Sequence, residues 1–184
     1  MTSLYIMRHG ESKANAARIV AGHLDTPLTE RGRQQARRAG QAAREDNLAI
    51  NVIVSSPLPR ARETAEIVAR EVGLSERDII LDQLLIERNC GQFEGGPLED
   101  YFAVSEADAE ARGVESLESL ERRAQLLLTK LERSHPNQTI LLVSHNGIIK
   151  TLQLVANHRP NSDHQRDQMV PNAEIVPLLA QPNR

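Results

Sequence analysis

The expected fold is decided by the stretch LYIMRHG (residues 4–10). Its apolar residues stop abruptly at Arg8, His9 and a glycine, which is how a buried parallel strand ends at its carboxyl edge. A second stretch of this kind, TILLVSHNG (residues 139–147), ends at His145. Because ligands bind outside the carboxyl ends of strands in open α/β sheets, we predict that the two histidines share one crevice.

Working outward from these stretches, strands alternate with helices along the chain. Further strands are expected at 51–54, 79–81 and 173–179. Helices are expected at about 30–46 (with Thr29 as N-cap), 60–72, 115–134 and 148–156. This alternation predicts an α/β fold: a mostly parallel open sheet with helices on both faces, in three α/β/α layers. Residues 1–184 are expected to form one domain, with 91–114 as a short inserted flap over the active-site edge.

The composition is ordinary for a globular protein, with 40% hydrophobic and 26% charged residues. A net charge of −3 and an aromatic content of 2% argue against nucleic-acid binding. The single cysteine, Cys90, excludes an intramolecular disulfide and is typical of a reducing compartment. No stretch approaches the roughly 20 apolar residues of a membrane span, and the N-terminus does not resemble a signal peptide. We therefore expect a cytoplasmic protein that binds neither nucleic acid nor membranes, with no indication of its oligomeric state.

Two arginines are expected beside the two histidines. Arg8 precedes His9, and Arg60 closes a third strand end, SSPLPR (residues 55–60). A neutral imidazole can attack phosphorus, and a planar guanidinium binds phosphate oxygens in pairs. The nearby arginines would also disfavour the protonated form of His9. Since fixed cations stabilise the transferred group, this chemistry requires no metal or other cofactor, and the remaining histidines lack the spacing of a metal site.

Five blocks of the sequence extend this pattern. They are MRHGES (residues 7–12) followed by Asn15, AGHLDTPLTERG (21–32), SSPLPRARETA (55–65), ERNCGQFEG (87–95) and VSHNG (143–147). In this order they resemble the signature of the histidine phosphatase superfamily, in the branch that contains cofactor-dependent phosphoglycerate mutases and related phosphatases. The resemblance implies a phosphatase that hydrolyses a small phosphorylated metabolite.

The resemblance also implies a role for each site residue. His9 would be the phosphorylated nucleophile, and Glu87 the general acid that protonates the leaving alkoxide and later activates water. The phosphate pocket would be lined by Arg8, Arg60 and His145, with Asn15 as a further donor. Weaker candidates for substrate contacts are Glu11, Ser12, His23, Arg88 and Asn146.

The sequence is also compatible with two other functions. A cofactor-dependent phosphoglycerate mutase would share the same residues, and the pair Glu87-Arg88 is mutase-like, since Arg88 could hold a carboxylate or second phosphate. The short segment between Glu87 and His145, and the stretch GQFEG (residues 91–95), favour hydrolysis instead. A regulatory phosphatase directed at phosphohistidine or phosphoproteins is the third alternative.

Acidic residues crowd the expected flap and the segment after it. Between Glu94 and Glu121 the sequence opposes its carboxylates with Arg112 alone. The simpler interpretation is a solvated acidic face. The alternative is a flap that repels polyanions or favours a substrate with an amine.

Overall fold

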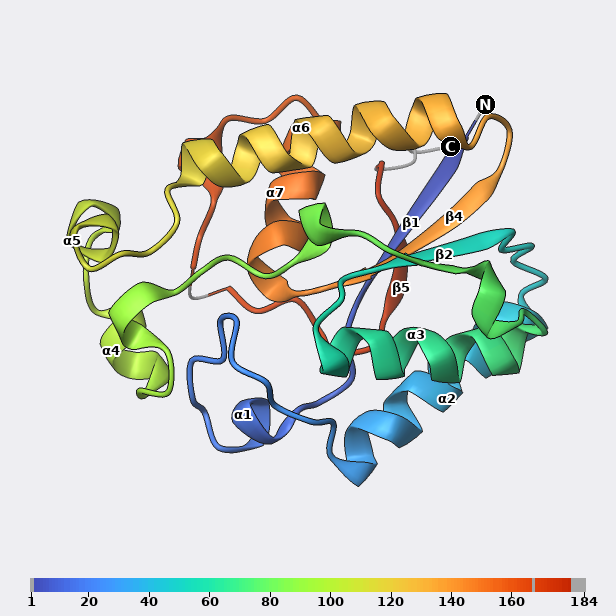
Figure 1. Cartoon of the computed structure of the whole chain (residues 1–184), viewed down its shortest axis with the longest axis horizontal. Helices are drawn as coiled ribbons and strands as arrows, with labels where there is room; N and C mark the ends of the chain where they lie inside the picture. The colour runs from blue at the N-terminus through green and yellow to red at the C-terminus, as the bar shows by residue number, and fades with distance from the viewer. Residues whose placement is uncertain (1, 167, 180–184) are drawn as a thin grey trace.

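The computed structural model describes residues 2–166 and 168–179 and has a five-stranded sheet at its centre (Figure 1). The strands are β1 (Ser3–Arg8), β2 (Val52–Ser55), β3 (Ile79–Leu81), β4 (Thr139–Ser144) and β5 (Ile175–Pro177). Their order in the sheet is β3-β2-β4-β1-β5, and β5 pairs antiparallel to β1 while the other pairings are parallel. The expected mostly parallel sheet is confirmed.

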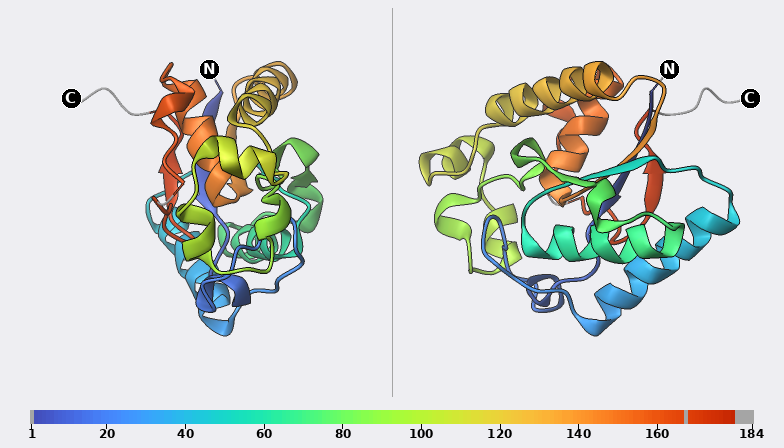
Figure 2. Two further views of the ribbon diagram at one scale, coloured as in Figure 1. Left: turned by 90° about the vertical axis from the view of Figure 1, so that its left-hand side faces the viewer. Right: turned by 45° about the vertical axis from the view of Figure 1, so that its right-hand side comes forward.

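Helices cover both faces of this sheet (Figures 1 and 2). The longer helices are α2 (Glu30–Glu45), α3 (Pro59–Val72), α6 (Leu117–Ser134) and α7 (Asn146–Ala156). Helices α2 and α3 lie on one face and α6 and α7 on the other, which completes the three layers. The sequence did not predict the short helices α1 (Lys13–Ala16), α4 (Leu98–Phe102) and α5 (Glu106–Ala111).

The central strands divide their side chains between two cores. Ile6 and Leu142 pack with α6 and α7, whereas Met7 and Leu141 pack with α2 and α3. All four are almost fully buried. Because side chains alternate across a strand, a shift of β1 by one residue would exchange these faces. The apolar pattern therefore fixes the register in which Arg8 lies opposite Ser144.

The flap carries α4 and α5 and lies beyond the carboxyl ends of β1 and β4 (Figures 1 and 2). It has a small core of its own, in which the rings of Phe93 and Tyr101 meet edge to face at 5.4 Å. Cys90 belongs to this core, and burial raises the pKa of its thiol to about 12. The thiol is therefore protonated and unreactive at neutral pH.

Four of the nine acidic residues from Glu94 to Glu121 form ion pairs with arginines that lie outside this segment. Their ion pairs are Arg18–Glu99, Arg88–Glu106, Arg123–Glu115 and Arg122–Glu118. The sequence missed these pairs because most of the arginines come from segments outside the acidic run. Asp100, Asp108 and Glu110 are exposed and have no ion pair with the other described residues, so this part of the flap matches the simpler expectation of a solvated acidic face.

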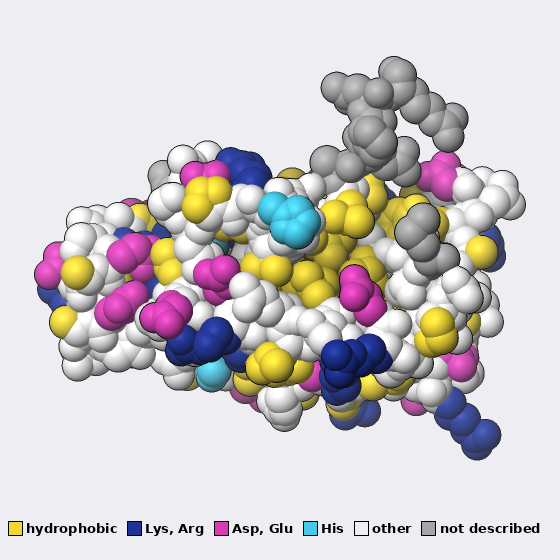
Figure 3. Space-filling view, turned by 90° about the horizontal axis from the view of Figure 1, so that it is seen from above, with side chains coloured by type: hydrophobic (Ala, Val, Ile, Leu, Met, Phe, Trp, Pro, Cys, Tyr) yellow, Lys and Arg dark blue, Asp and Glu magenta, His cyan; other side chains and the backbone are white. Residues whose placement is uncertain are grey.

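The surface seen from above the sheet mixes charges of both signs around a hollow where hydrophobic side chains gather (Figure 3). No single-signed patch dominates this face, in keeping with the small net charge. Among the described residues, no helix combines the length and the apolar character that crossing a membrane requires.

Gly32 packs its backbone against the turn that follows His9, and this contact leads to the first prediction. A Cβ at Gly32 would lie 2.1 Å from the backbone oxygen of Glu11. Gly32→Ala should therefore lower the free energy of unfolding by about 1–3 kcal/mol, the cost of overpacking a filled site. Glycine-to-alanine changes inside a helix normally act in the opposite direction.

Urea unfolding of the variant measures this cost, with Ala42→Gly as the control at an exposed position of the same helix. The control reports helix propensity alone, about 1 kcal/mol in favour of alanine. If Gly32→Ala proved as stable as the parent, the close approach of α2 to the turn after β1 would be disproved.

Candidate active site

His9 lies at the carboxyl end of β1, where its backbone N–H donates to the carbonyl of Ser144 at 2.9 Å. Its Nδ1 lies 2.7 Å from the carbonyl oxygen of Gly10, which can only accept, so Nδ1 carries the proton of the neutral ring. The lone pair is then on Nε2, and the Nε–H of Arg60 donates to it at 3.3 Å. Both contacts hold His9 in the tautomer that a nucleophile requires.

His145 enters the same site from the end of β4, directly before α7 begins. The two imidazole centroids lie 5.1 Å apart, with the rings inclined at 60°. Nε2 of His145 lies 2.7 Å from the hydroxyl of Ser56. Its Nδ1 is buried and has no hydrogen-bond partner within the described part of the chain. A buried nitrogen in this state is ready to bind a group that enters from solvent.

Burial and positive charge keep both imidazoles neutral. Removal from water lowers the pKa of His9 well below 6.5, and the charges of Arg60 and Arg8 lower it further. The pKa of His145 falls for the same leading reasons, burial first and Arg60 second. At neutral pH the site therefore holds two uncharged imidazoles beside two buried cations.

Arg60 is the more rigidly held of the two cations. It lies in the first turn of α3, only 1% exposed, and its guanidinium donates to the carbonyls of Leu24 at 2.8 Å and Gly22 at 2.7 Å. Burial is the main cause of its lowered pKa. The loop at residues 22–24 is thus bound by the same guanidinium that contacts His9.

Arg8 lies on the other side of the nucleophile. It donates from Nη1 to the carbonyl of Val170 at 2.7 Å, while its Nε is buried without a partner among the described residues. Burial lowers its pKa to about 10, so it stays charged at neutral pH. Together with Nδ1 of His145, this Nε leaves the site with two buried nitrogens available to a phosphate.

Glu87 faces the N-terminus of α7. One of its carboxylate oxygens accepts from the backbone N–H of Gly147 at 3.0 Å and of Arg88 at 2.8 Å. These two N–H donors fix the orientation of the carboxyl group. A Cβ at residue 147 would lie 2.8 Å from the same oxygen, so the close approach requires a glycine there.

Asn15 is oriented by its neighbours so that its amide can donate. Its Oδ1 accepts from the backbone N–H of Ser12 at 3.1 Å and from the side chain of Asn172 at 3.3 Å. These contacts leave the NH₂ group as the free end of the side chain. Ser12, a weaker candidate, is fully buried and caps α1 with its hydroxyl, so it serves the fold.

Arg88 is held by partners inside the protein. It is 2% exposed, and its guanidinium pairs with Glu106 at 2.8 Å and donates to the carbonyl of Glu115 at 2.7 Å. A buried arginine needs a carboxylate partner, and α5 supplies it. Arg88 thus anchors the flap, and its proposed contact with a substrate stays untested.

Three other weak candidates also have partners inside the protein. Glu11 accepts from the hydroxyl of Thr29 at 2.8 Å, and Asn146 accepts from the backbone N–H of Val170 at 2.7 Å. His23 contacts the backbone oxygen of Glu87 at 2.7 Å through Nε2. Their proposed contacts with substrate stay untested, and their positions suit them to holding loops around the site.

The comparisons with known proteins agree with this geometry. Residues 4–184 match the family model of the histidine phosphatase superfamily, branch 1. The chain belongs to the histidine phosphatase superfamily.

Relatives of this family member carry the names of phosphatases and of mutases. It is 34% identical over 152 residues to the uncharacterized phosphatase PhoE of Bacillus subtilis, covering 83% of this chain and 76% of the relative. It is 38% identical over 162 residues to a probable phosphoglycerate mutase GpmB of Erwinia tasmaniensis, covering 83% and 73%. The structure of a phosphoserine phosphatase from Entamoeba histolytica with 3-phosphoglyceric acid superimposes with a TM-score of 0.79, at 28% identity, covering 95% and 89%.

Sequence reasoning missed three residues that hold this histidine phosphatase site in place. Ser56 contacts His145, and the hydroxyl of Thr64 accepts from the backbone N–H of Gly10 at 3.1 Å. Asn172 donates to the carbonyl of His9 at 2.8 Å. Ser56 and Thr64 belong to the block that carries Arg60, so the third strand end was a signal for them. Asn172 had no such signal, because it lies in an irregular segment far along the chain.

The buried histidines predict how stability depends on pH. Below pH 6.5 the unfolded chain binds protons at His9 and His145 that the folded protein excludes. Lowering the pH from 7 to 5.5 should therefore destabilise the fold, each imidazole contributing up to about 1.4 kcal/mol per pH unit. His9→Asn should make urea-unfolding free energies fall less steeply with decreasing pH.

The matched control is His158→Asn, which replaces an exposed histidine. This variant should keep the pH dependence of the parent protein. An identical dependence in the parent and in His9→Asn would mean that His9 titrates normally in the folded state.

Proposed function

We propose that this protein is a phosphatase that hydrolyses a small phosphate monoester through a phosphohistidine at His9. The observation that carries the proposal is the state of His9: buried, neutral, with Nδ1 bound to Gly10 and the lone pair of Nε2 directed at Arg60. The family match and the relatives named as phosphatases support the same activity.

In the first step, Nε2 of His9 attacks phosphorus and the bond from phosphorus to the ester oxygen breaks. Glu87 gives its proton to the departing alkoxide, and the alcohol leaves. Arg60 must release Nε2 for this attack, and its guanidinium can then turn its donors to the phosphoryl oxygens. Charge on those oxygens is further stabilised by Arg8 and His145, whose free buried nitrogens suit this purpose.

In the second step, water attacks the phosphorus of the phosphohistidine. Glu87, now a carboxylate, takes a proton from that water, and the phosphorus–nitrogen bond breaks. Phosphate leaves, and His9 returns to its neutral form with the proton still on Nδ1. The carbonyl of Gly10 holds this proton throughout, which stabilises the positive charge that the phosphorylated ring carries.

The proposal includes independence from metal ions and a cytoplasmic location. The cations that the reaction needs are supplied by Arg8 and Arg60, whose positions are fixed by the fold. The lone buried Cys90 is consistent with a reducing compartment. Hydrolysis of p-nitrophenyl phosphate in the presence of a chelator tests the first point directly.

Trapping the intermediate tests the role of His9. Brief reaction with labelled ester followed by denaturation should yield a phosphoprotein that is labile in acid and stable in base. His9→Ala should abolish the label and lower kcat/KM by on the order of 10⁴-fold or more, because the covalent route is lost. His158→Ala is the control and should label normally. A label that survived in His9→Ala would assign the nucleophile to another residue.

The general acid is tested by varying the leaving group. Glu87→Gln should slow hydrolysis of alkyl phosphates by about 10²–10⁴-fold, because a poor leaving group needs protonation. It should slow p-nitrophenyl phosphate far less, since nitrophenolate departs without a proton. Steady-state rates on both esters give the comparison. Equal losses on both would show that Glu87 is not the acid.

Phosphoglycerate mutase activity is the second candidate, favoured by the relatives with that name. A mutase must keep water from the phosphohistidine until the second hydroxyl of its substrate is phosphorylated. Incubation of the protein with 3-phosphoglycerate and a bisphosphoglycerate primer distinguishes the two reactions. Release of inorganic phosphate supports the phosphatase, and 2-phosphoglycerate without phosphate release supports the mutase.

A further inference from the structure

The position of one proton on His145 decides how this residue can bind a phosphate. Its Nδ1 is buried without a hydrogen-bond partner in the described part of the chain, and its Nε2 lies 2.7 Å from the hydroxyl of Ser56. Burial and the charge of Arg60 lower the pKa of His145 well below 6.5, so the ring is neutral at pH 7. A neutral imidazole carries its one proton on either nitrogen. The contact with Ser56 therefore determines whether Nδ1 donates or accepts.

The hydroxyl of Ser56 has one proton to donate and one place to put it. Ser56 follows β2 directly and is fully buried, and its oxygen accepts from the backbone N–H of Leu58 at 3.3 Å. Among the described residues, Nε2 of His145 is the sole acceptor within hydrogen-bond distance of this hydroxyl. If Nε2 carried the ring proton, the hydroxyl oxygen would accept from both neighbours and its own proton would have no acceptor. That arrangement is disfavoured, because a buried donor without an acceptor costs free energy.

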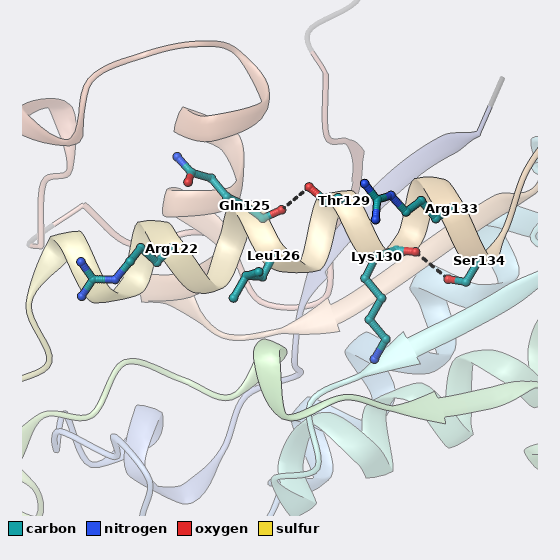
Figure 4. Close-up of a pocket in the computed structure, with 7 residues that line it drawn as sticks. All are labelled: Arg122, Gln125, Leu126, Thr129, Lys130, Arg133 and Ser134. Atoms are coloured by element: carbon teal, nitrogen blue, oxygen red, sulfur yellow. Dashed lines mark hydrogen bonds between the residues drawn. The ribbon is translucent and has the colours of Figure 1, made fainter.

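Hydroxyl groups on α6 show the usual alternative, which is donation to a backbone carbonyl. Thr129 donates to the carbonyl of Gln125 at 2.9 Å, and Ser134 donates to the carbonyl of Lys130 at 2.7 Å (Figure 4). Both acceptors lie one helical turn before the hydroxyl. Ser56 has no carbonyl acceptor of this kind within the described residues, which leaves the imidazole to accept its proton.

We propose that Ser56 is a positioning residue whose hydroxyl donates to Nε2 of His145 and thereby places the ring proton on Nδ1, the nitrogen without a partner. The inference rests on the proposed phosphatase function and specifies how His145 acts in it. Nδ1 donates to a phosphoryl oxygen, which can only accept. The two histidines then have complementary roles, since His9 presents a lone pair on Nε2 and His145 presents an N–H.

This tautomer also limits what His145 can do when water attacks the phosphohistidine. The lone pair of Nε2 accepts from Ser56, and Nδ1 already bears a proton, so neither nitrogen can take a proton from the attacking water. That task stays with the carboxylate of Glu87. The N–H of His145 instead stabilises the charge on the phosphoryl oxygens in both steps, because a fixed donor needs no reorganisation during the reaction.

NMR of protein that contains histidine labelled with a nitrogen isotope reads this tautomer directly. Protonated and unprotonated ring nitrogens give separate signals, and the spectrum of His145→Asn identifies those of His145 among the six histidines. At pH 7 the parent protein should carry the His145 proton on Nδ1. Ser56→Ala should lose this preference, so that a population with the proton on Nε2 appears. Ser56→Thr keeps the hydroxyl and should restore the Nδ1 tautomer.

Steady-state kinetics measure what the tautomer contributes to the reaction. Ser56→Ala should lower kcat/KM for p-nitrophenyl phosphate by about 10-fold, the effect of losing one net hydrogen bond to the transferred group, and Ser56→Thr should recover most of it. The matched control is Ser55→Ala, which removes a neighbouring buried hydroxyl that donates to the carbonyl of Ser56 at 3.0 Å. This control should keep both the tautomer and kcat/KM. Thermal unfolding shows that each variant is folded before it is compared.

The spectrum and the kinetics separate this proposal from the proposed function. A parent protein with the His145 proton on Nε2 would overturn the proposal even if esters are hydrolysed, and this test needs no variant at position 56. A folded Ser56→Ala that keeps the Nδ1 tautomer alone, or that changes tautomer with kcat/KM unaltered, would also overturn it. If the parent protein hydrolyses no ester, the proposed function fails by itself. In that case, a change of tautomer between the parent and Ser56→Ala still supports the role of the hydroxyl.

Discussion

The parallel pairing of β1 with β4 is the constraint on which the rest of this structure depends. It places Arg8 opposite Ser144, so that the next residues along both strands, His9 and His145, emerge side by side at the sheet edge. The register is held by two separate cores, one on each face. A slip by one residue would bury polar side chains and separate the histidines, so the packing energy of the sheet also secures the active site.

Burial of the site residues gives the site its chemistry, but it also lowers the free energy of unfolding. Arg8 and Arg60 are nearly removed from water, and nitrogens of Arg8 and His145 lack partners within the described residues. An unsatisfied buried polar group typically costs about 1–3 kcal/mol. A phosphate that supplies the missing acceptors recovers this free energy on binding. Folding therefore fixes these nitrogens in positions where they can bind a charged group.

The sequence was sufficient to predict the sheet, the four long helices and the pairing of the two histidines with two arginines. These features follow from short-range patterns: apolar runs, caps and strand ends. It did not show the ion pairs Arg88–Glu106 and Arg18–Glu99, because the two partners of each pair come from separate segments of the chain. The orienting role of Asn172 could not be predicted either, because this residue lies in an irregular segment far along the chain from His9.

The segment after α7 links parts of the protein that the sequence separates. His164 contacts the carbonyl of Gly147, whose N–H binds Glu87, and Arg166 pairs with Glu106 of the flap. Farther along, Asn172 donates to the carbonyl of His9. The flap cannot move away without breaking the Arg166–Glu106 pair, and the segment cannot shift without losing contacts at both ends of the catalytic site. Arg166 and Asn172 thus connect the region after α7 with the flap and with the backbone of His9, respectively.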